Sequence, residues 1–418
     1  MNAPQADSYE TRIKRVNDAI ELKVPDRVPM LLPFNFFAAR HAGLTNEETF
    51  YDLEKWLGAY EKCILDFQPD LYFQPQGAVF TGGMVHETLG NKQIKWPGHG
   101  VGVNETFQFV EGEYMLADEY DLFLEDPSDF AIRTYLPRVF TALEGFALIP
   151  GLRSMLAGYA GAPALCGMLT LPPLVTAFEA LVKAAPESMR WTVGYLEFEK
   201  KMDAAGYPAY SAGIGLAPFD IVSDFLRGMR GTMLDMYRRP EKLLTVIEGT
   251  LPMIEAFAMN TALLSGNPRV FIPLHRGADG FMSNEQFERF YWPTLKTLIV
   301  NLVDAGYVPC PFFEGVYDQR LEYLKELPRG KVLGMFDKTD LVKARQAIGD
   351  TMCIAGGMQV SLLQSGTPEQ VEEHTRMIIE TVGSDGGFIM TSNTILDDAK
   401  PELLRAWVDA TLKYGSTA

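Results

Sequence analysis

Polar side chains follow four apolar segments in the last third of the chain, each where the segment ends. They are Glu314 after Tyr307–Phe313, Asp337 after Val332–Phe336, Gln359 after the segment that starts at Cys353, and Asn393 after Phe388–Met390. A carboxylate can act as a general acid or base if burial raises its pKa. Helix capping alone would favour Ser, Asp and Asn, so Glu314, Lys338 and Gln359 favour a functional site over caps.

One of the five histidines, His275, directly follows a further apolar segment, Val270–Leu274. An imidazole at such a position can carry protons or bind a metal. Arg276 comes next and could bind substrate. The structural alternative is that Arg276 simply forms an ion pair with Glu314.

His275 and Glu314 stand at the ends of strands that are consecutive in sequence, and adjacent strands lie about 4.8 Å apart. Both side chains could therefore bind one zinc ion, with Asn393, Gln359 or water at the other positions. The competing interpretation is that the pair transfers protons without a metal.

The elements that must position these residues alternate between apolar segments and helical segments, which predicts an α/β fold, a (β/α)8 TIM barrel with its site at the strand carboxyl ends. The four remaining strands are expected at Val28–Leu32, Pro69–Phe73, Tyr207–Gly215 and Val270–Leu274. Residues 1–418 are expected to form one domain. A long insertion, about residues 77–205, separates the second strand from the third.

Several finer elements are also predicted. Helices are expected over residues 8–24, 45–67 (with Thr45 as N-cap) and 232–265. Inside the insertion we expect a hairpin of residues 107–110 with 114–116, and residues 164–169 could form a ninth strand.

Polar residues also follow the first two strands, and we expect them to contact substrate: Asn35, Gln74 and Gln76. Phenylalanines gather near three strand ends and include Phe36 and Phe312, which we assign to the substrate site. Such phenylalanines could be core residues, or they could line an apolar or aromatic pocket.

Composition excludes several classes of protein. The chain has 418 residues, 47% hydrophobic, and a net charge of -17, which argues against nucleic acid because phosphates need clustered Lys and Arg. No apolar run approaches the ~20 residues of a membrane span. The four cysteines are far apart, and the first seven residues lack a signal region, so a cytoplasmic location is expected.

Several motifs resemble the uroporphyrinogen decarboxylase superfamily. They are Arg27–Pro29 at the first strand, Met282–Phe290 with Trp292–Pro293, Gly366–Val371, Gly386–Ile389 and Lys400–Leu404. The resemblance implies a (β/α)8 barrel and one of two activities. One branch decarboxylates porphyrinogen side chains without a cofactor. The other transfers methyl groups to or from a corrinoid on a partner protein, with a catalytic zinc.

The chain departs from both branches. Its first loop, Phe34–Gly43, has a single arginine, and no acid follows Gln74–Gln76, so many-carboxylate porphyrinogens fit poorly. The His-x-Cys motif of the zinc-dependent branch is replaced by Phe312–Glu314, and the later cysteine by Ser392–Thr394. Methyl transfer to a thiol is therefore disfavoured, but the resemblance remains closer to the methyltransferase branch.

These observations predict a methyltransferase or demethylase that acts on a small apolar or aromatic substrate. A corrinoid, free or on a separate protein, would accept the methyl group, with Glu314, His275 and Asp337 as catalytic residues. The alternatives are a decarboxylase or lyase that uses Glu314 and His275 as acid and base, and a barrel that binds a ligand without turnover. The chain could also pair as a homodimer.

Overall fold

Eight parallel strands form a barrel in the computed structural model, which describes residues 7–416; the expectation about a signal region rests almost wholly on residues outside this range. The strands are β1 (Leu31–Leu32), β2 (Leu71–Tyr72), β6 (Gly213–Ile214), β7 (Arg269–Leu274), β8 (Val308–Phe313), β9 (Leu333–Phe336), β10 (Cys353–Met358) and β11 (Phe388–Ser392). Each coincides with one of the eight predicted strand positions.

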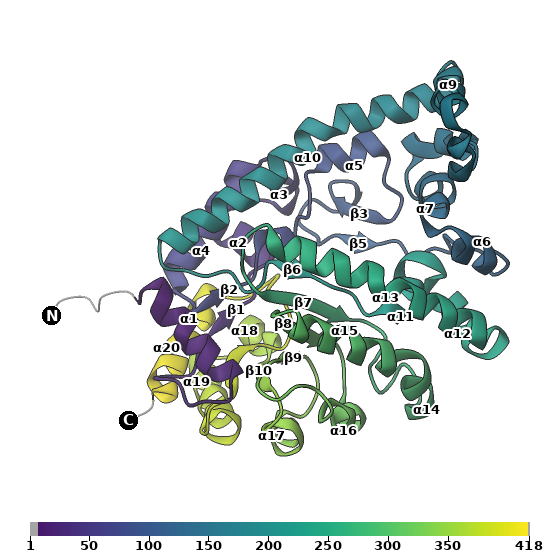
Figure 1. Ribbon diagram of the computed structural model, residues 1–418. Helices are drawn as coiled ribbons and strands as arrows, with labels where there is room; N and C mark the ends of the chain where they lie inside the picture. Colours follow the sequence, from purple (N-terminus) through teal and green to yellow (C-terminus); the bar gives the residue numbers. More distant parts are fainter. Residues whose placement is uncertain (1–6, 417–418) are drawn as a thin grey trace.

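The barrel is closed by two parallel bridges. Strands β6 to β11 form one six-stranded sheet, and β1 pairs with β2. Met30 bridges Met390, which joins β1 to β11, and Tyr72 bridges Ala209, which joins β2 to the segment that enters β6. The predicted (β/α)8 barrel is thus confirmed (Figure 1).

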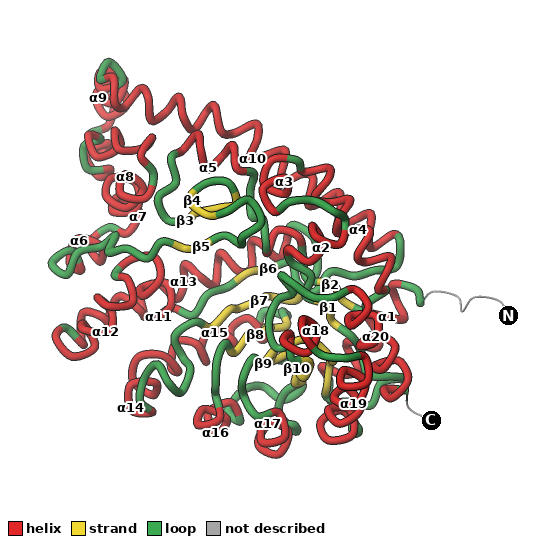
Figure 2. The backbone as a smooth tube through the Cα atoms, turned by 180° about the vertical axis from the view of Figure 1, so that it is seen from behind, coloured by secondary structure: helices red, strands yellow, loops and turns green. Residues whose placement is uncertain are grey.

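Helices surround the strands on the outside of the barrel (Figure 2). They are α1 (Tyr9–Ile20), α2 (Phe36–His41), α3 (Asn46–Tyr51), α4 (Leu53–Phe67), α11 (Pro218–Asp220), α12 (Gly228–Arg238), α13 (Pro240–Leu263), α14 (Asn284–Gln286), α15 (Trp292–Asp304), α16 (Leu321–Leu324), α17 (Leu341–Ile348), α18 (Val360–Ser365), α19 (Pro368–Ile378) and α20 (Pro401–Gly415). Single π-helical turns continue three of them, at Ile221–Leu226, Phe287–Tyr291 and Ile379–Gly383.

Local side-chain chemistry sets the helix boundaries. Thr45 is the expected N-cap, and it forms a capping box with Glu48, in which each side chain accepts a hydrogen bond from the other residue's backbone N–H. The helix predicted over residues 45–67 is nevertheless broken, because Asp52 adopts an extended conformation and its side chain caps α4. The first predicted helix also ends earlier than expected, at Ile20.

Residues 77–205, between β2 and β6, carry the small sheet β4–β3–β5 and a group of helices beside it (Figure 1). The α-helices and strands of this segment are α5 (Gly83–Leu89), β3 (Ile94–Pro97), β4 (Gly100–Val101), β5 (Gln108–Phe109), α6 (Tyr120–Glu125), α7 (Pro127–Phe130), α8 (Leu136–Val139), α9 (Gly161–Met168) and α10 (Pro172–Ala204).

Two predictions within this segment are wrong. The hairpin of residues 107–110 with 114–116 does not form, because β5 pairs with β3 and the N–H groups of Tyr114 and Met115 both donate to the carbonyl of Leu226. Residues 164–169 are not a ninth strand but belong mainly to α9. A short apolar run does not by itself distinguish a strand from a helix.

No single helix among residues 7–416 is long and apolar enough to cross a membrane. Gly158–Met168 and Pro172–Ala204 pass the length and composition criteria only as a pair, with a bend of 92° between them.

A buried ionic cluster fastens α1 to the strand amino ends. Asp70 is buried and accepts hydrogen bonds from Arg15 at 2.6 Å, from Arg27 at 2.6 and 2.8 Å, and from the backbone N–H of Met30 at 2.8 Å. Together with Asp7 and Asp26, which also pair with these arginines, Asp70 compensates the charges of Arg15 and Arg27 where β1 and β2 begin.

Replacing Asp70 with Ala is expected to destabilise the fold strongly, by about 3–5 kcal/mol, because it leaves buried Arg15 without its most buried counter-charge. Urea unfolding of the variant measures this loss. Lys14→Ala, which removes the exposed Lys14–Asp18 pair, is the control and should cost ~1 kcal/mol or less. Equal losses for the two variants would contradict the structural role of the cluster.

Candidate active site

The pairing of β7 with β8 brings His275 and Glu314 together. Leu274 lies in register with Phe313, so the next residues of the two strands are neighbours. The Nε2 atom of His275 lies 3.8 Å from Oε1 of Glu314. The side chains remain 30% and 40% exposed, respectively, so the pair is accessible from the carboxyl end of the barrel.

Two acids that follow β6 position the histidine. Nδ1 of His275 lies 2.5 Å from Oδ2 of Asp224, whose other oxygen accepts a bond from Arg276 at 2.9 Å. Oδ2 of the buried Asp220 accepts the backbone N–H of His275 at 2.9 Å and the Tyr291 hydroxyl at 2.8 Å. Arg276 therefore pairs with Asp224 and not with Glu314.

Asp337 and Asn393 join the loops on the other side of Glu314. Asp337 accepts the Gly315 N–H at 3.0 Å and the Asn393 amide at 2.9 Å, and the amide oxygen of Asn393 accepts the Val360 N–H at 3.0 Å. Gly315 turns the chain at a φ of 87°, a conformation that favours glycine, directly after Glu314. We infer that Asp337, predicted to be catalytic, and Asn393 position the Glu314 loop.

The remaining predicted site residues lie apart from this pair. Gln74 is buried and donates to Ser211 at 2.9 Å, and Asn35 is buried and donates to Asp397. Gln76 is half-buried, and Gln359 is exposed at the start of α18. None of these four side chains forms a hydrogen bond or ion pair with His275 or Glu314.

The phenylalanines near the strand ends are core residues, which was one of the two alternatives. Phe36 packs against Phe50, Trp56 and Phe107, and Phe312 stacks on Phe271 inside the barrel with ring centroids 6.4 Å apart. Both are buried, so neither supplies an aromatic rim.

Sequence reasoning missed Asp220, Asp224 and Tyr291. A signal for the two acids was present, because they are four residues apart on a helical segment directly after the third predicted strand. Tyr291 had no such signal, since it lies 71 residues from Asp220 and reaches it only through the fold.

The electrostatics of the pair favour bound protons. Burial lowers the pKa of His275, but the hydrogen bond to Asp224 and the charges of Asp220, Asp224 and Glu314 outweigh it and raise the pKa from 6.5 to about 9. Burial raises the pKa of Glu314, and the neighbouring His275 offsets only part of this effect. At neutral pH the imidazole is therefore cationic, and Glu314 holds its proton more tightly than an exposed carboxyl.

The donor set does not fit a catalytic zinc, which takes three protein ligands. No group of three or more His, Cys, Asp or Glu side chains within residues 7–416 could hold a metal ion. Asn393 is bonded to Asp337 and Gln359 is exposed, so neither completes a three-ligand set with His275 and Glu314. We derive no step through a metal.

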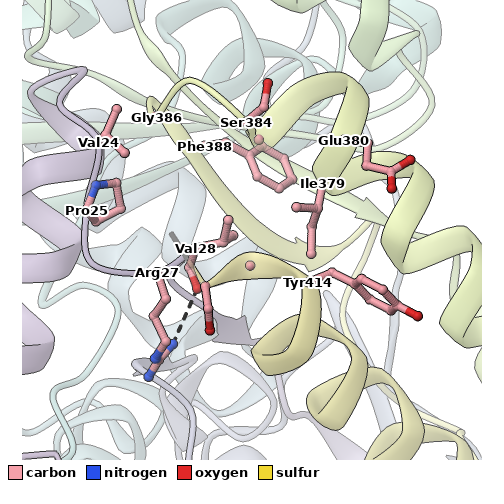
Figure 3. Close-up of a pocket in the computed structure, with 13 residues that line it drawn as sticks. Val24, Pro25, Arg27, Val28, Ile379, Glu380, Ser384, Gly386, Phe388 and Tyr414 are labelled. Carbon is pink, nitrogen blue, oxygen red and sulfur yellow. Dashed lines mark hydrogen bonds between the residues drawn. The ribbon is translucent and has the colours of Figure 1, made fainter. Parts of the chain in front are cut away.

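A cavity of about 220 Å³ lies at the opposite end of the barrel (Figure 3). Its walls include Val28, which precedes β1, and Phe388, the first residue of β11, together with Ile379 and Tyr414. It therefore belongs to the strand amino ends and not to the His275–Glu314 pair.

Asp224 should control the protonation of His275. In Asp224→Asn the burial of His275 remains while the charge of its principal partner is lost, so we expect the pKa of His275 to fall from about 9 toward or below 6.5. NMR titration of the imidazole measures it, with Asp121→Asn as an exposed control. An unchanged pKa would contradict this assignment.

The raised pKa of His275 makes the stability of the fold depend on pH. Because the folded-state pKa is raised, the stabilisation that protonated His275 contributes is full below pH 6.5 and is lost as pH rises through about 9. The difference in free energy of unfolding between wild type and His275→Gln should fall across this window.

Metal analysis tests the donor-set argument separately. Protein purified without chelator should carry less than about a tenth of an equivalent of zinc, because two donors give a weak site. Stoichiometric zinc that is lost in His275→Gln would contradict this expectation.

Comparison with known proteins identifies the family. Residues 206–414, half of the chain, match the family model described as uroporphyrinogen decarboxylase (URO-D). The uroporphyrinogen decarboxylase of Idiomarina loihiensis is 25% identical over 183 residues, 43% of this chain and 50% of that protein. That of Citrobacter koseri is 25% identical over 177 residues, 42% of this chain and 49% of that protein. The chain thus matches about half the length of these curated relatives.

A solved structure agrees with the architecture along nearly the entire chain. A methyltransferase from Methanosarcina mazei superposes with a TM-score of 0.62 over 98% of this chain and 99% of its own, at 12% sequence identity. That likeness concerns the fold, whereas the family match covers the strands and loops that carry His275 and Glu314. The chain belongs to the uroporphyrinogen decarboxylase family.

Proposed function

We propose that this protein is a methyltransferase that removes a methyl group from a small, uncharged methyl ether, apolar or aromatic in character. Glu314 donates the proton to the leaving oxygen, and His275 returns a proton to Glu314. The observation that carries the proposal is the pair itself, a carboxyl with a raised pKa 3.8 Å from an imidazolium. The likeness of the fold to a solved methyltransferase supports the same branch.

The charges around the pair disfavour a substrate with several carboxylates. Four acids, Asp220, Asp224, Glu314 and Asp337, lie around the two cations His275 and Arg276. Both cations already pair with Asp224. Carboxylates brought beside these acids would lack counter-charges, at a cost of several kcal/mol per buried ion.

Proton donation suits the departure of an alkoxide or phenolate. The C–O bond of the ether breaks, the methyl group leaves as a cation equivalent, and the electron pair remains on oxygen. The proton of Glu314 then neutralises that oxygen, and His275, held by Asp224, can restore the proton to Glu314 across 3.8 Å.

The methyl acceptor would be a reduced corrinoid, free or on a separate protein, which supplies the strong nucleophile that an ether requires. A methyl acceptor has access to the pair, because the side chains of His275 and Glu314 remain partly exposed. The residues of this chain orient the ether and deliver the proton.

Glu314→Gln should slow demethylation by about 10²–10⁴-fold, the usual contribution of a general acid. Incubation with anisole-type ethers and cob(I)alamin, followed through phenol release and the cobalt spectrum, measures this effect. Glu322→Gln, an exposed glutamate on α16, is the matched control. An ether with a nitro-substituted leaving group needs less protonation, so it should lose much less rate in Glu314→Gln.

Decarboxylation is the alternative activity, because the curated relatives are named for it. The same experiment distinguishes it from demethylation. Carbon dioxide release from a small carboxylic acid, without phenol release from any ether, would overturn the methyltransferase proposal. An equal loss of rate for both classes of ether would contradict the role of Glu314 as the acid.

A further inference from the structure

An apolar stripe runs along the outer face of α10, the 33-residue helix at the edge of the molecule in both views (Figures 1 and 2). The opposite face of this helix packs inward through side chains such as Leu174, Ala177 and Trp191. The stripe begins at the N-cap and consists of Leu171, Val175, Phe178, Val182, Pro186, Met189 and Val193.

The stripe is exposed and uncharged. All seven residues are exposed except the half-buried Val175, and Val182 and Met189 keep 73% and 61% of their surface. Their spacing of three and four residues is that of a helix-pairing seam, and it extends over roughly 33 Å at 1.5 Å per residue. So much continuous apolar surface is typical of an interface.

The stripe is symmetric about Val182. Phe178 and Pro186 lie four residues on either side, Val175 and Met189 lie seven, and Leu171 and Val193 lie eleven. An antiparallel copy of the same helix centred on Val182 would therefore place an apolar residue opposite every apolar residue. This self-complementarity is what a two-fold, isologous interface requires.

A hollow of about 450 Å³ lies on the same face, along the amino-terminal half of the stripe up to Val182. Its walls are formed by Leu169, Val175, Phe178, Glu179, Val182 and Lys183. Apolar side chains from a second helix could fill it as knobs fill holes.

The flanking charges complement each other across the same axis. Glu179 and Lys183 lie on one side of the stripe, and among the described residues neither has an ion-pair partner. With the axis at Val182, Lys183 of the second copy is level with residue 181, about 3 Å along the helix from Glu179. The symmetry makes two such pairs.

We propose that α10 is a homodimer interface, in which two copies of this chain pair antiparallel about Val182. A membrane surface is the weaker occupant, because interfacial helices favour basic flanks. Here an acid and a base alternate, and the chain carries a net charge of -17. The proposal is independent of the chemistry at Glu314.

The full-length chain should sediment as a dimer of twice its 46.6 kDa mass at micromolar concentration. Val182→Glu, which places two glutamates face to face on the axis, should weaken the dimer by at least 100-fold in Kd. Leu264→Glu, at a position that is 66% exposed but outside the stripe, should leave it dimeric. Circular dichroism confirms that each variant is folded.

Mixed charge variants test the register. Glu179→Lys and Lys183→Glu should each weaken the homodimer, whereas an equimolar mixture of the two should form a heterodimer with both ion pairs restored. A monomeric wild type, or a dimer that Val182→Glu leaves intact, would overturn the proposal. So would a monomer that co-sediments with anionic vesicles through the stripe.

Discussion

The in-register pairing of β7 with β8 is the constraint on which the candidate site depends. Leu274 opposite Phe313 makes His275 and Glu314 the first residues beyond two adjacent strands, so the backbone ladder fixes their separation before any side chain contributes. Asp220 strengthens this arrangement because it accepts the backbone N–H of His275 itself. A shift of one residue in either strand would turn one of the two side chains toward the opposite face.

The sequence predicted all eight strands and the His275–Glu314 pair, because polar residues at strand ends are a local signal in a barrel of alternating elements. It could not predict Asp224 as the partner of Nδ1, since that contact depends on how the segment after β6 folds back over the strand ends. The burial of Phe36 and Phe312 could not be predicted for a related reason. The sequence around a phenylalanine at a strand end does not show whether the side chain points into the core or toward a pocket. In the structure both side chains are buried. The break between α3 and α4 was also missed. The Asp52 side chain caps α4, but the helical pattern of the sequence continues through this position.

Carboxylates at the two ends of the barrel differ in how completely they are paired. At the amino ends, Asp70 accepts four hydrogen bonds from Arg15, Arg27 and Met30, and no oxygen is left without a donor. At the carboxyl ends, Glu314 faces a single cation at 3.8 Å and keeps part of its surface exposed. Saturated charges stabilise a fold, whereas a carboxyl with free capacity can exchange protons with a substrate. The contrast explains why the first cluster is structural and the second is the candidate site.

Asp220 and Asp224 lie close together, and their surroundings shift their pKa values in opposite directions. Its Oδ2 accepts bonds from two neutral donors, the His275 N–H and the Tyr291 hydroxyl, while Oδ1 is buried without a partner. Burial and the charge of Asp224 therefore raise the pKa of Asp220. Burial also acts on Asp224, but its bonds to His275 and Arg276 prevail and lower its pKa. Two close carboxyls thus differ in proton affinity, with the pKa of Asp220 raised and that of Asp224 lowered. The more acidic Asp224, hydrogen-bonded to Nδ1, is the carboxylate that keeps His275 cationic and leaves Nε2 directed at Glu314.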